Sequence, residues 1–203
     1  MYNLARYYHP TFSRKEFAMF TQYSIENAPE ASGKILSAVH SKMGFVPNLF
    51  AYIAESPNAT AAYAQLDQLL NQTSLEPIER QLILLTTSVT NGCEFCVAAH
   101  SAGATKARAD KETLAAVRRG DNPADAKLAA LVTFVRTLVQ ERGWASEDDV
   151  KAFLAAGFSK ENIFDVIMAV SLKTLSNYSN HLTQPPLNPE LEPFAWSAEK
   201  ELS

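Results

Sequence analysis

The sequence has no long apolar run and no leader-like start. None of its 203 residues fall in a stretch of eighteen apolar residues, which is about the length that a membrane-spanning helix needs. The opening residues, MYNLARYYHPTFSRKEF, lack the apolar segment that a secretory signal peptide requires. We therefore expect a cytoplasmic protein that does not span or bind a membrane.

Positive charge is scarce and scattered. The chain has 18 Lys and Arg against 22 Asp and Glu, a formal net charge of −4. A surface that binds nucleic acid or anionic lipid would need clustered positive charge. We therefore expect no nucleic-acid partner, and small molecules or proteins are the expected partners.

The alternation of apolar and polar residues that is typical of strands is also missing. Apolar residues instead recur at helical spacing, and 47% hydrophobic content is enough for a sizeable core. The predicted class is all-α, a bundle of about seven to eight helices. Helix starts are indicated at Ser56-Pro57, Ser74, Asp110, Asn122-Pro123, Ser146 and Ser159. We expect an N-terminal extension (1–30), a helical domain (31–182) and an extended Pro-rich tail (183–203).

Cysteine is rare, and both cysteines lie in one short segment. Cys93, Cys96 and His100 follow the turn-forming pair Asn91-Gly92, so the cysteines should open a new helix, with Cys93 in its first turn. Offsets of three and four residues place all three side chains on one helix face, with His100 over Cys96. A helix N-terminus and a neighbouring imidazolium lower a thiol pKa. The spacing therefore indicates dithiol redox chemistry.

Alternative roles for the cysteine pair fit the spacing less well. A structural disulfide would close too small a ring to add much stability. A zinc site would have only three ligands here, with no second ligand pair elsewhere. Attachment of haem would need His directly after the second cysteine, where Val97 stands. Two inert buried thiols beside a core histidine are the remaining alternative.

The last predicted helix, from Ser159 to about His181, is nearly apolar all round in its middle. This pattern indicates burial against other helices or a second subunit, so a homo-oligomer is expected. Asn177 and His181 lie one turn apart on it, and a capping or surface role is expected for them. Phe194 and Trp196 give the tail apolar anchors.

Several motifs of the chain resemble those of a known protein family. Residues 75–82 leading into 91–100, together with 43–50, 56–57, 177–178 and 180–181, resemble the alkylhydroperoxidase D-like proteins of the carboxymuconolactone decarboxylase superfamily, most closely the peroxidase-related branch. The resemblance implies an all-helical homo-oligomer that reduces hydroperoxides without a metal or haem cofactor. It implies that Cys96 attacks peroxide, Cys93 resolves the product as a disulfide and His100 is the base. A lipoyl or thioredoxin-type dithiol protein would supply electrons.

One position departs from the family pattern. The family usually has a glutamate twelve residues before the first cysteine, and this chain has Gln81. A glutamine can orient a water but cannot accept its proton at neutral pH. Glu79 should face elsewhere, about 200° around the helix. The prediction is a slowed peroxidase in which Gln81 is a polar orienter and Gln81→Glu raises the rate.

The sequence thus predicts a peroxiredoxin-like enzyme, a thiol-dependent hydroperoxide reductase with Cys96, Cys93, His100 and Gln81 as its site. A general disulfide oxidoreductase, a carboxymuconolactone-type decarboxylase and a non-catalytic redox-sensing oligomer are the alternatives. The decarboxylase is disfavoured, because the namesake enzymes lack the cysteine pair.

Overall fold

In a computed structural model the chain is described over residues 19–201, and this part is all-helical, without a β-strand. It contains ten α-helices and one 3-10 helix. The helix count exceeds the predicted seven to eight because the short helices α2 (Asn48–Ile53) and α10 (Ala198–Glu201) were not foreseen. Of the predicted N-terminal extension, residues 1–18 lie outside the described part of the chain.

The longer helices follow one another with short connections. Their bounds are α1 (Glu30–Met43), α3 (Pro57–Leu70), α4 (Pro77–Thr90), α5 (Glu94–Lys106), α6 (Lys111–Arg118), α7 (Ala126–Gln140), α8 (Glu147–Ala155) and α9 (Lys160–Thr183). No helix in residues 19–201 is long and apolar enough to cross a bilayer.

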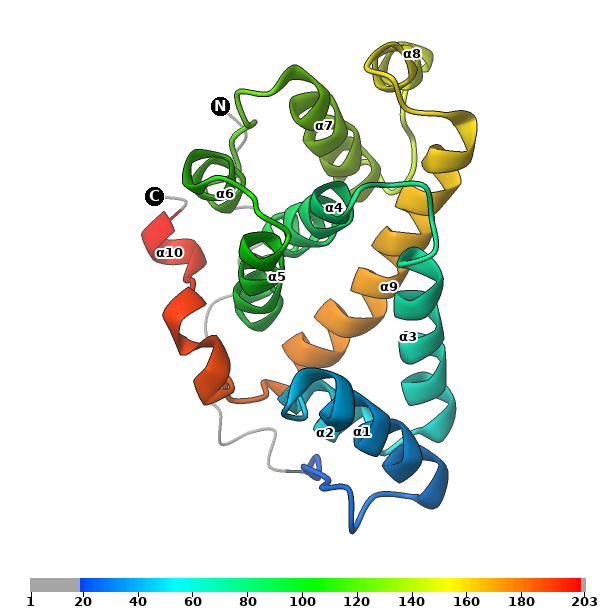
Figure 1. The fold of residues 1–203 in the computed structure, drawn as a ribbon, viewed down its shortest axis with the longest axis vertical. Helices are drawn as coiled ribbons and strands as arrows, with labels where there is room; N and C mark the ends of the chain where they lie inside the picture. The colour runs from blue at the N-terminus through cyan, green and yellow to red at the C-terminus, as the bar shows by residue number, and fades with distance from the viewer. Residues whose placement is uncertain (1–18, 202–203) are drawn as a thin grey trace.

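Helix α4 lies at the centre of the bundle. It packs against α5, α6, α7 and α9, and α9 runs past α4 along α3 (Figure 1). Four consecutive residues of α4, Leu82 to Leu85, are buried, which confirms the burial predicted from its wide apolar surface. Because α4 ends at the turn before the cysteines, the core fixes where the cysteine segment begins.

Capping chemistry accounts for most helix starts. The side chains of Ser56, Asp110, Ser146 and Ser159 each accept a hydrogen bond from a first-turn amide of the helix that follows, as predicted. Helix α1 ends at Gly44 in the left-handed conformation, with φ 85°, which a glycine adopts without steric cost.

Two predicted helix starts are wrong. Helix α4 begins after Glu76 rather than Ser74, because Pro77 fits the first helical turn and Glu76 forms a capping box with Glu79. The Ser74 hydroxyl instead accepts a hydrogen bond from Asn162. Helix α7 begins after Asp125, whose carboxylate accepts from the Leu128 amide, and not at Asn122-Pro123.

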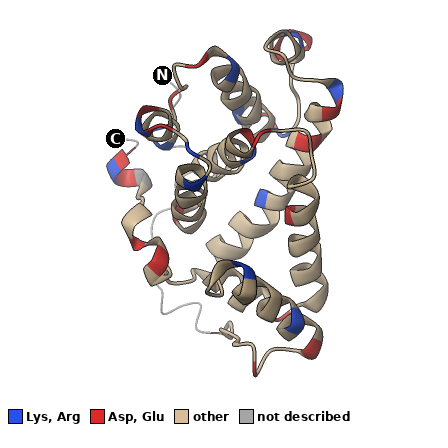
Figure 2. Cartoon of the chain, in the orientation of Figure 1, with Lys and Arg blue, Asp and Glu red and all other residues tan. Residues whose placement is uncertain are grey.

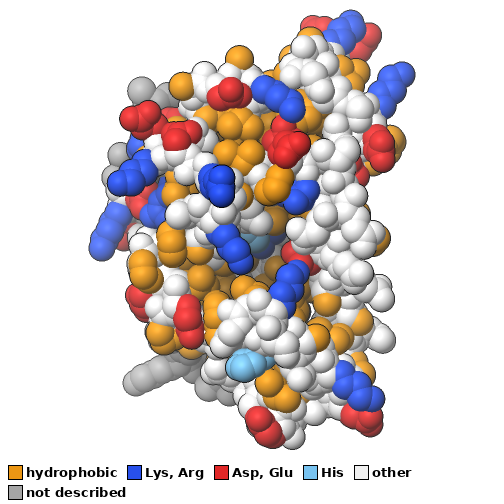
Figure 3. All heavy atoms as spheres, viewed as in Figure 1, with side chains coloured by type: hydrophobic (Ala, Val, Ile, Leu, Met, Phe, Trp, Pro, Cys, Tyr) orange, Lys and Arg blue, Asp and Glu red, His pale blue; other side chains and the backbone are white. Residues whose placement is uncertain are grey.

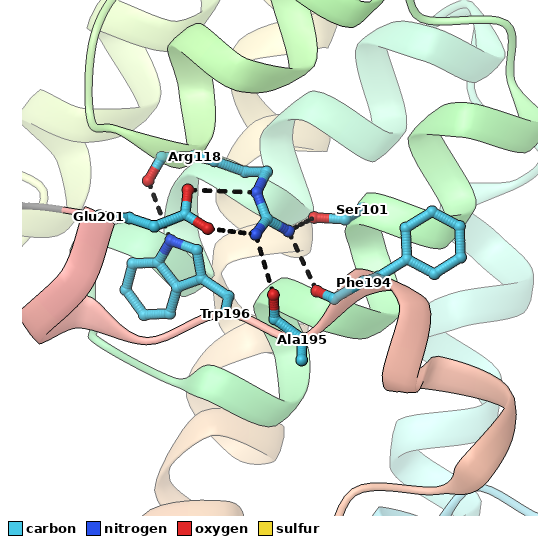
Figure 4. Close-up of polar contacts among 6 residues, drawn as sticks. All are labelled: Ser101, Arg118, Phe194, Ala195, Trp196 and Glu201. Carbon is cyan, nitrogen blue, oxygen red and sulfur yellow. Dashed lines mark hydrogen bonds and ion pairs between the residues drawn. The ribbon is translucent and has the colours of Figure 1, made fainter.

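The C-terminal tail is not extended throughout, although the sequence predicted that it would be. Residues Pro189–Phe194 form the 3-10 helix η3, which packs against α5. Arg118 of α6 donates to the carbonyl oxygens of Phe194 and Ala195, both at 3.0 Å, and pairs with Glu201 (Figure 4). The Trp196 indole is buried and donates to the Arg118 carbonyl. The two predicted aromatic anchors therefore dock on the chain's own bundle.

Candidate functional site

The two cysteines lie at the junction between α4 and α5. Cys93 is the N-cap residue of α5, one position before the predicted first turn, and its amide donates to the Ser88 carbonyl at 2.9 Å. Cys96 lies in the first turn of α5. Both are free thiols and both are buried, with 2% and 1% of their surface exposed. Helix α5 then continues through Gly103 to Lys106.

Two polar side chains lie beside the Cys96 sulfur. The Asn180 amide nitrogen lies 3.2 Å from Cys96 Sγ and 3.7 Å from Cys93 Sγ. The Ser176 hydroxyl lies 3.9 Å from Cys96 Sγ. Both side chains come from α9, so the two sulfurs lie between the start of α5 and the C-terminal half of α9.

The two thiols have opposite pKa shifts. Burial by itself would raise the pKa of Cys96, but the hydrogen bond from Cys93 and the Lys173 ammonium hold it well below its usual range. Burial raises the pKa of Cys93, and its hydrogen bond to the Cys96 thiolate raises it further. A thiolate is the reactive species, and Cys96 is the thiol of the pair whose surroundings favour that form.

His100 is partly buried, and both of its ring nitrogens have partners other than sulfur. Its Nε2 lies 2.8 Å from Lys173 Nζ, and its Nδ1 lies 3.2 Å from Gln81 Oε1. Burial and the nearby Lys173 ammonium lower its pKa well below the ordinary value. The imidazole is therefore neutral near pH 7, and the direct pairing of His100 with Cys96 that spacing predicted is replaced by an intervening lysine.

Gln81 reaches His100 across a gap that only glycine leaves open. A Cβ on Gly103 would lie 2.3 Å from Gln81 Oε1 and 2.7 Å from its Cδ, well inside van der Waals contact. Glu79, by contrast, faces α7, where its carboxylate pairs with Lys127 at 2.6 Å. The prediction that Glu79 faces away from the site is confirmed.

Sequence reasoning missed three contributors from α9. Lys173, Ser176 and Asn180 follow one another at offsets of three and four residues, and all are buried. Asn177 belongs to the same stripe, because it is fully buried and accepts a hydrogen bond from Asn91, so the capping or surface role expected for it is wrong. His181 is exposed, as predicted. The available signal was a polar stripe at helical spacing inside an apolar helix.

The surface over α5, α9 and α1 is hollowed, with a histidine at the floor of the hollow and Lys or Arg side chains at its rim (Figure 3). Within residues 19–201 no three His, Cys, Asp or Glu side chains are grouped so as to hold a metal ion.

Comparison with known proteins places this site in a family context. Residues 57–136 match the carboxymuconolactone decarboxylase family, a range that contains both cysteines, His100 and Gln81. The sequence matches no protein of curated function.

Solved structures share the fold. A peroxidase-related protein from Ralstonia eutropha JMP134, described as an alkylhydroperoxidase AhpD core, is 23% identical with a TM-score of 0.73, covering 85% of this chain and 94% of its own. A peroxidase-related protein from Silicibacter sp. TM1040 is 23% identical with a TM-score of 0.71, covering 84% and 93%. The debrominase Bmp8 is 14% identical with a TM-score of 0.73, covering 87% and 96%. At these identities the similarity shows a shared fold and does not show a shared activity.

Proposed function

We propose that the protein is a thiol-dependent peroxidase that reduces hydroperoxides, because residues 57–136 match the carboxymuconolactone decarboxylase family and the chain has the AhpD-like fold. Cys96 is the nucleophile and Cys93 is the resolving thiol. The same fold also serves a debrominase, so the argument depends on the site and not on the fold.

The observation that carries the proposal is the asymmetry of the two thiols. Cys96 accepts hydrogen bonds from Asn180 and Cys93, and each of these bonds favours its thiolate. Cys93 is a neutral donor beside it. A peroxidase of this type needs one ionised thiol to attack and a second, protonated thiol to follow.

The reaction has two steps that balance. The Cys96 thiolate attacks one peroxide oxygen, the O–O bond breaks, and the leaving alkoxide or hydroxide takes up one proton, which gives Cys96 sulfenic acid and an alcohol or water. The Cys93 thiol then displaces the hydroxyl of the sulfenic acid, which forms the Cys93–Cys96 disulfide and releases water. We propose that His100, held between Gln81 and Lys173, takes part in moving this proton.

A dithiol donor closes the cycle. Its two thiols reduce the Cys93–Cys96 disulfide by exchange and are themselves oxidised to a disulfide. With Cys93 at 2% and Cys96 at 1% exposure, a slender lipoyl-type arm suits the site better than a broad protein surface, and a thioredoxin-type donor would need local opening. The same burial favours small hydroperoxides as substrates.

The test is peroxide consumption by the purified protein with a dithiol reductant, with the thiol state followed by mass spectrometry. We expect turnover in the wild type, none in Cys96→Ser, and a stalled Cys96 sulfenic acid in Cys93→Ser. No wild-type turnover together with a reversible disulfide would overturn the proposal in favour of disulfide exchange or redox sensing.

We also propose that the protein associates with copies of itself through the outer face of α9. Phe164, Ile167, Tyr178 and Leu182 are 71%, 42%, 63% and 51% exposed and recur at helical spacing, an apolar stripe of the kind that interfaces cover. Sedimentation velocity should show an oligomer that Phe164→Glu with Tyr178→Glu dissociates. A monomeric wild type would contradict this.

A further inference from the structure

One lysine is fully buried in the middle of α9. Lys173 has no exposed surface, although lysine is among the residues least often found inside proteins. Charged residues otherwise lie mostly toward the outside of the bundle, whereas the middle of α9 is uncharged except for one basic stretch that borders α3 and α4 (Figure 2). A buried ammonium is stable only when an anion or several acceptors face it.

The counter-charge of Lys173 is not a carboxylate. The ion pairs with Asp and Glu in residues 19–201 involve other lysines and arginines. The titratable groups that face Lys173 are Cys93 and Cys96 at the start of α5, His100 on α5 and Tyr63 on α3. Burial raises the pKa of Tyr63 to about 12, so its phenol is neutral. Cys96 is the one whose anion is stabilised.

The hydrogen bonds around Lys173 have a defined direction. An ammonium has only donors, so Lys173 donates to His100 Nε2 at 2.8 Å. The neutral imidazole then carries its proton on Nδ1 and donates it to Gln81 Oε1 at 3.2 Å. The order is therefore lysine to histidine to glutamine, and it ends on a group that takes up no proton.

We propose that Lys173 is a catalytic residue: it holds Cys96 as the thiolate and delivers the proton that the leaving oxygen takes up. His100 and Gln81 position it. The inference rests on the proposed function and deepens it, because it assigns the acid and base roles to a residue on α9 rather than to a carboxylate and histidine. A neutral Gln81 fits this arrangement, because a carboxylate there would draw the lysine charge away from Cys96.

Protons balance through the whole cycle. Lys173 protonates the leaving oxygen when Cys96 becomes a sulfenic acid, which leaves a neutral amine. That amine takes the Cys93 proton as Cys93 attacks and passes it to the departing hydroxide, so that water leaves. When a dithiol reduces the disulfide, one of its two protons returns to Cys93 and the other to Lys173.

The test reads Cys96 ionisation without any peroxide. Thiolate absorbance and alkylation rate are measured against pH in Cys93→Ser protein, with and without Lys173→Met. Methionine matches lysine in length and leaves no buried charge, because Cys96 can take up a proton. In Lys173→Met we expect the titration midpoint of the Cys96 thiol (the Cys96 midpoint) to rise by about 1 to 3 pH units. The alkylation rate of Cys96 at pH 7 should fall about tenfold or more. Lys127→Met, which removes the partner of Glu79, is the matched control and should leave both unchanged.

An unchanged Cys96 midpoint in Lys173→Met would overturn the inference even if peroxide turnover is normal. A raised midpoint in a protein that reduces no peroxide would support the thiolate role and reject the proposed function instead. The two failures are thus separable.

Gln81→Glu gives a second test in which Lys173 stays in place, so that folding is not at risk from its loss. The family pattern predicts that Gln81→Glu is a faster peroxidase. The lysine mechanism predicts instead that Gln81→Glu has a raised Cys96 midpoint and slower turnover. A faster Gln81→Glu enzyme would overturn the lysine mechanism. In Lys173→Met protein the same change should restore part of the lost rate, because the introduced carboxylate and His100 can then hold the proton together.

Discussion

At the scale of single residues, Asn180 connects the two sulfurs. Its amide nitrogen donates to both, while its Oδ1 is buried without a hydrogen-bond partner. An unpaired buried acceptor costs free energy. The hydroxyl of a Cys96 sulfenic acid would be a donor within the same space, so Asn180 suits the oxidised intermediate as well as the thiolate.

Replacing Asn180 by Leu should weaken the thiolate. A hydrogen bond to a charged group contributes about 1.5 to 3 kcal/mol, so alkylation of Cys96 near pH 7 should slow about tenfold or more. The comparison is Ser179→Ala, whose hydroxyl bonds only to its own helix at Leu175. Equal alkylation rates in the two variants would show that Asn180 does not stabilise the thiolate.

His100 should make the protein sensitive to acid. Burial and the Lys173 ammonium depress its folded pKa below the ordinary 6.5, so below that pH the unfolded chain binds a proton that the folded chain refuses. The free energy of unfolding should therefore fall as pH drops below about 6.5. The free energy of unfolding, measured by urea denaturation between pH 4 and 7, should depend less steeply on pH in His100→Gln than in the wild type. His40→Gln, which replaces an exposed histidine, is the control. The same pH dependence in all three proteins would count against a neutral buried imidazole.

The sequence predicted the residues that lie close together along the chain. Cys93, Cys96 and His100 fall within two helical turns, and their shared face follows from the 3.6-residue repeat. Lys173 was not predicted, because it follows His100 by some seventy residues in the sequence. A single charged residue in an apolar helix is also more often exposed than buried. Only the tertiary packing of α9 on α5 brings it between His100 and Cys96.

At the scale of elements, Gly103 of α5 leaves the space that the Gln81 side chain of α4 occupies. Alanine there would force the Gln81 amide aside, because its Cβ would lie 2.3 Å from Oε1. Alanine also favours a helix by about 1 kcal/mol over glycine, so the fold should survive while the Gln81–His100 hydrogen bond is lost.

Gly103→Ala should consequently change the tautomer signal of His100 in nitrogen NMR while leaving the unfolding midpoint nearly unchanged. Gly33→Ala is the contrasting variant, because its Cβ would meet the Ile25 backbone oxygen at 3.0 Å, which cannot swing away. That variant should lose stability and keep the His100 spectrum. An unaltered His100 signal in Gly103→Ala would refute the packing argument.

Helix boundaries were predictable wherever a side chain caps the helix. Ser56, Asp110, Ser146 and Ser159 were found from sequence because an N-cap is a local interaction. Ser74 and Asn122 are equally good caps by residue type, but stronger local signals follow each of them. The proline at the start of α4 and the Asp125 cap of α7 decided those boundaries.

At the scale of the whole molecule, the tail holds α5 and α6 together. Arg118 links Ser101 of α5, next to His100, to the tail carbonyls and to Glu201 (Figure 4). The tail route could not be read from the sequence, because prolines at 185, 186, 189 and 193 indicate only that an α-helix is excluded. Where Leu191 and Trp196 are buried is decided by the bundle.

Arg118→Ala should lower the free energy of unfolding by about 2 to 3 kcal/mol, because several partly buried acceptors lose a charged donor. The neighbouring Arg119, half-exposed and paired with Asp121, gives the control, and Arg119→Ala should cost about 1 kcal/mol or less. Urea denaturation measures both. If Arg118→Ala lowers the free energy of unfolding no more than Arg119→Ala does, the contacts of Arg118 with the tail add little to stability.

The most direct test of the central claim is a single turnover. Fully reduced protein is mixed with one equivalent of a small hydroperoxide, without a reductant, and the Cys93–Cys96 pair is followed by mass spectrometry of the trapped peptide. The account predicts stoichiometric conversion to the intramolecular disulfide, with a sulfenic acid on Cys96 when Cys93 is serine. Unreacted thiols, or first oxidation at Cys93, would contradict it.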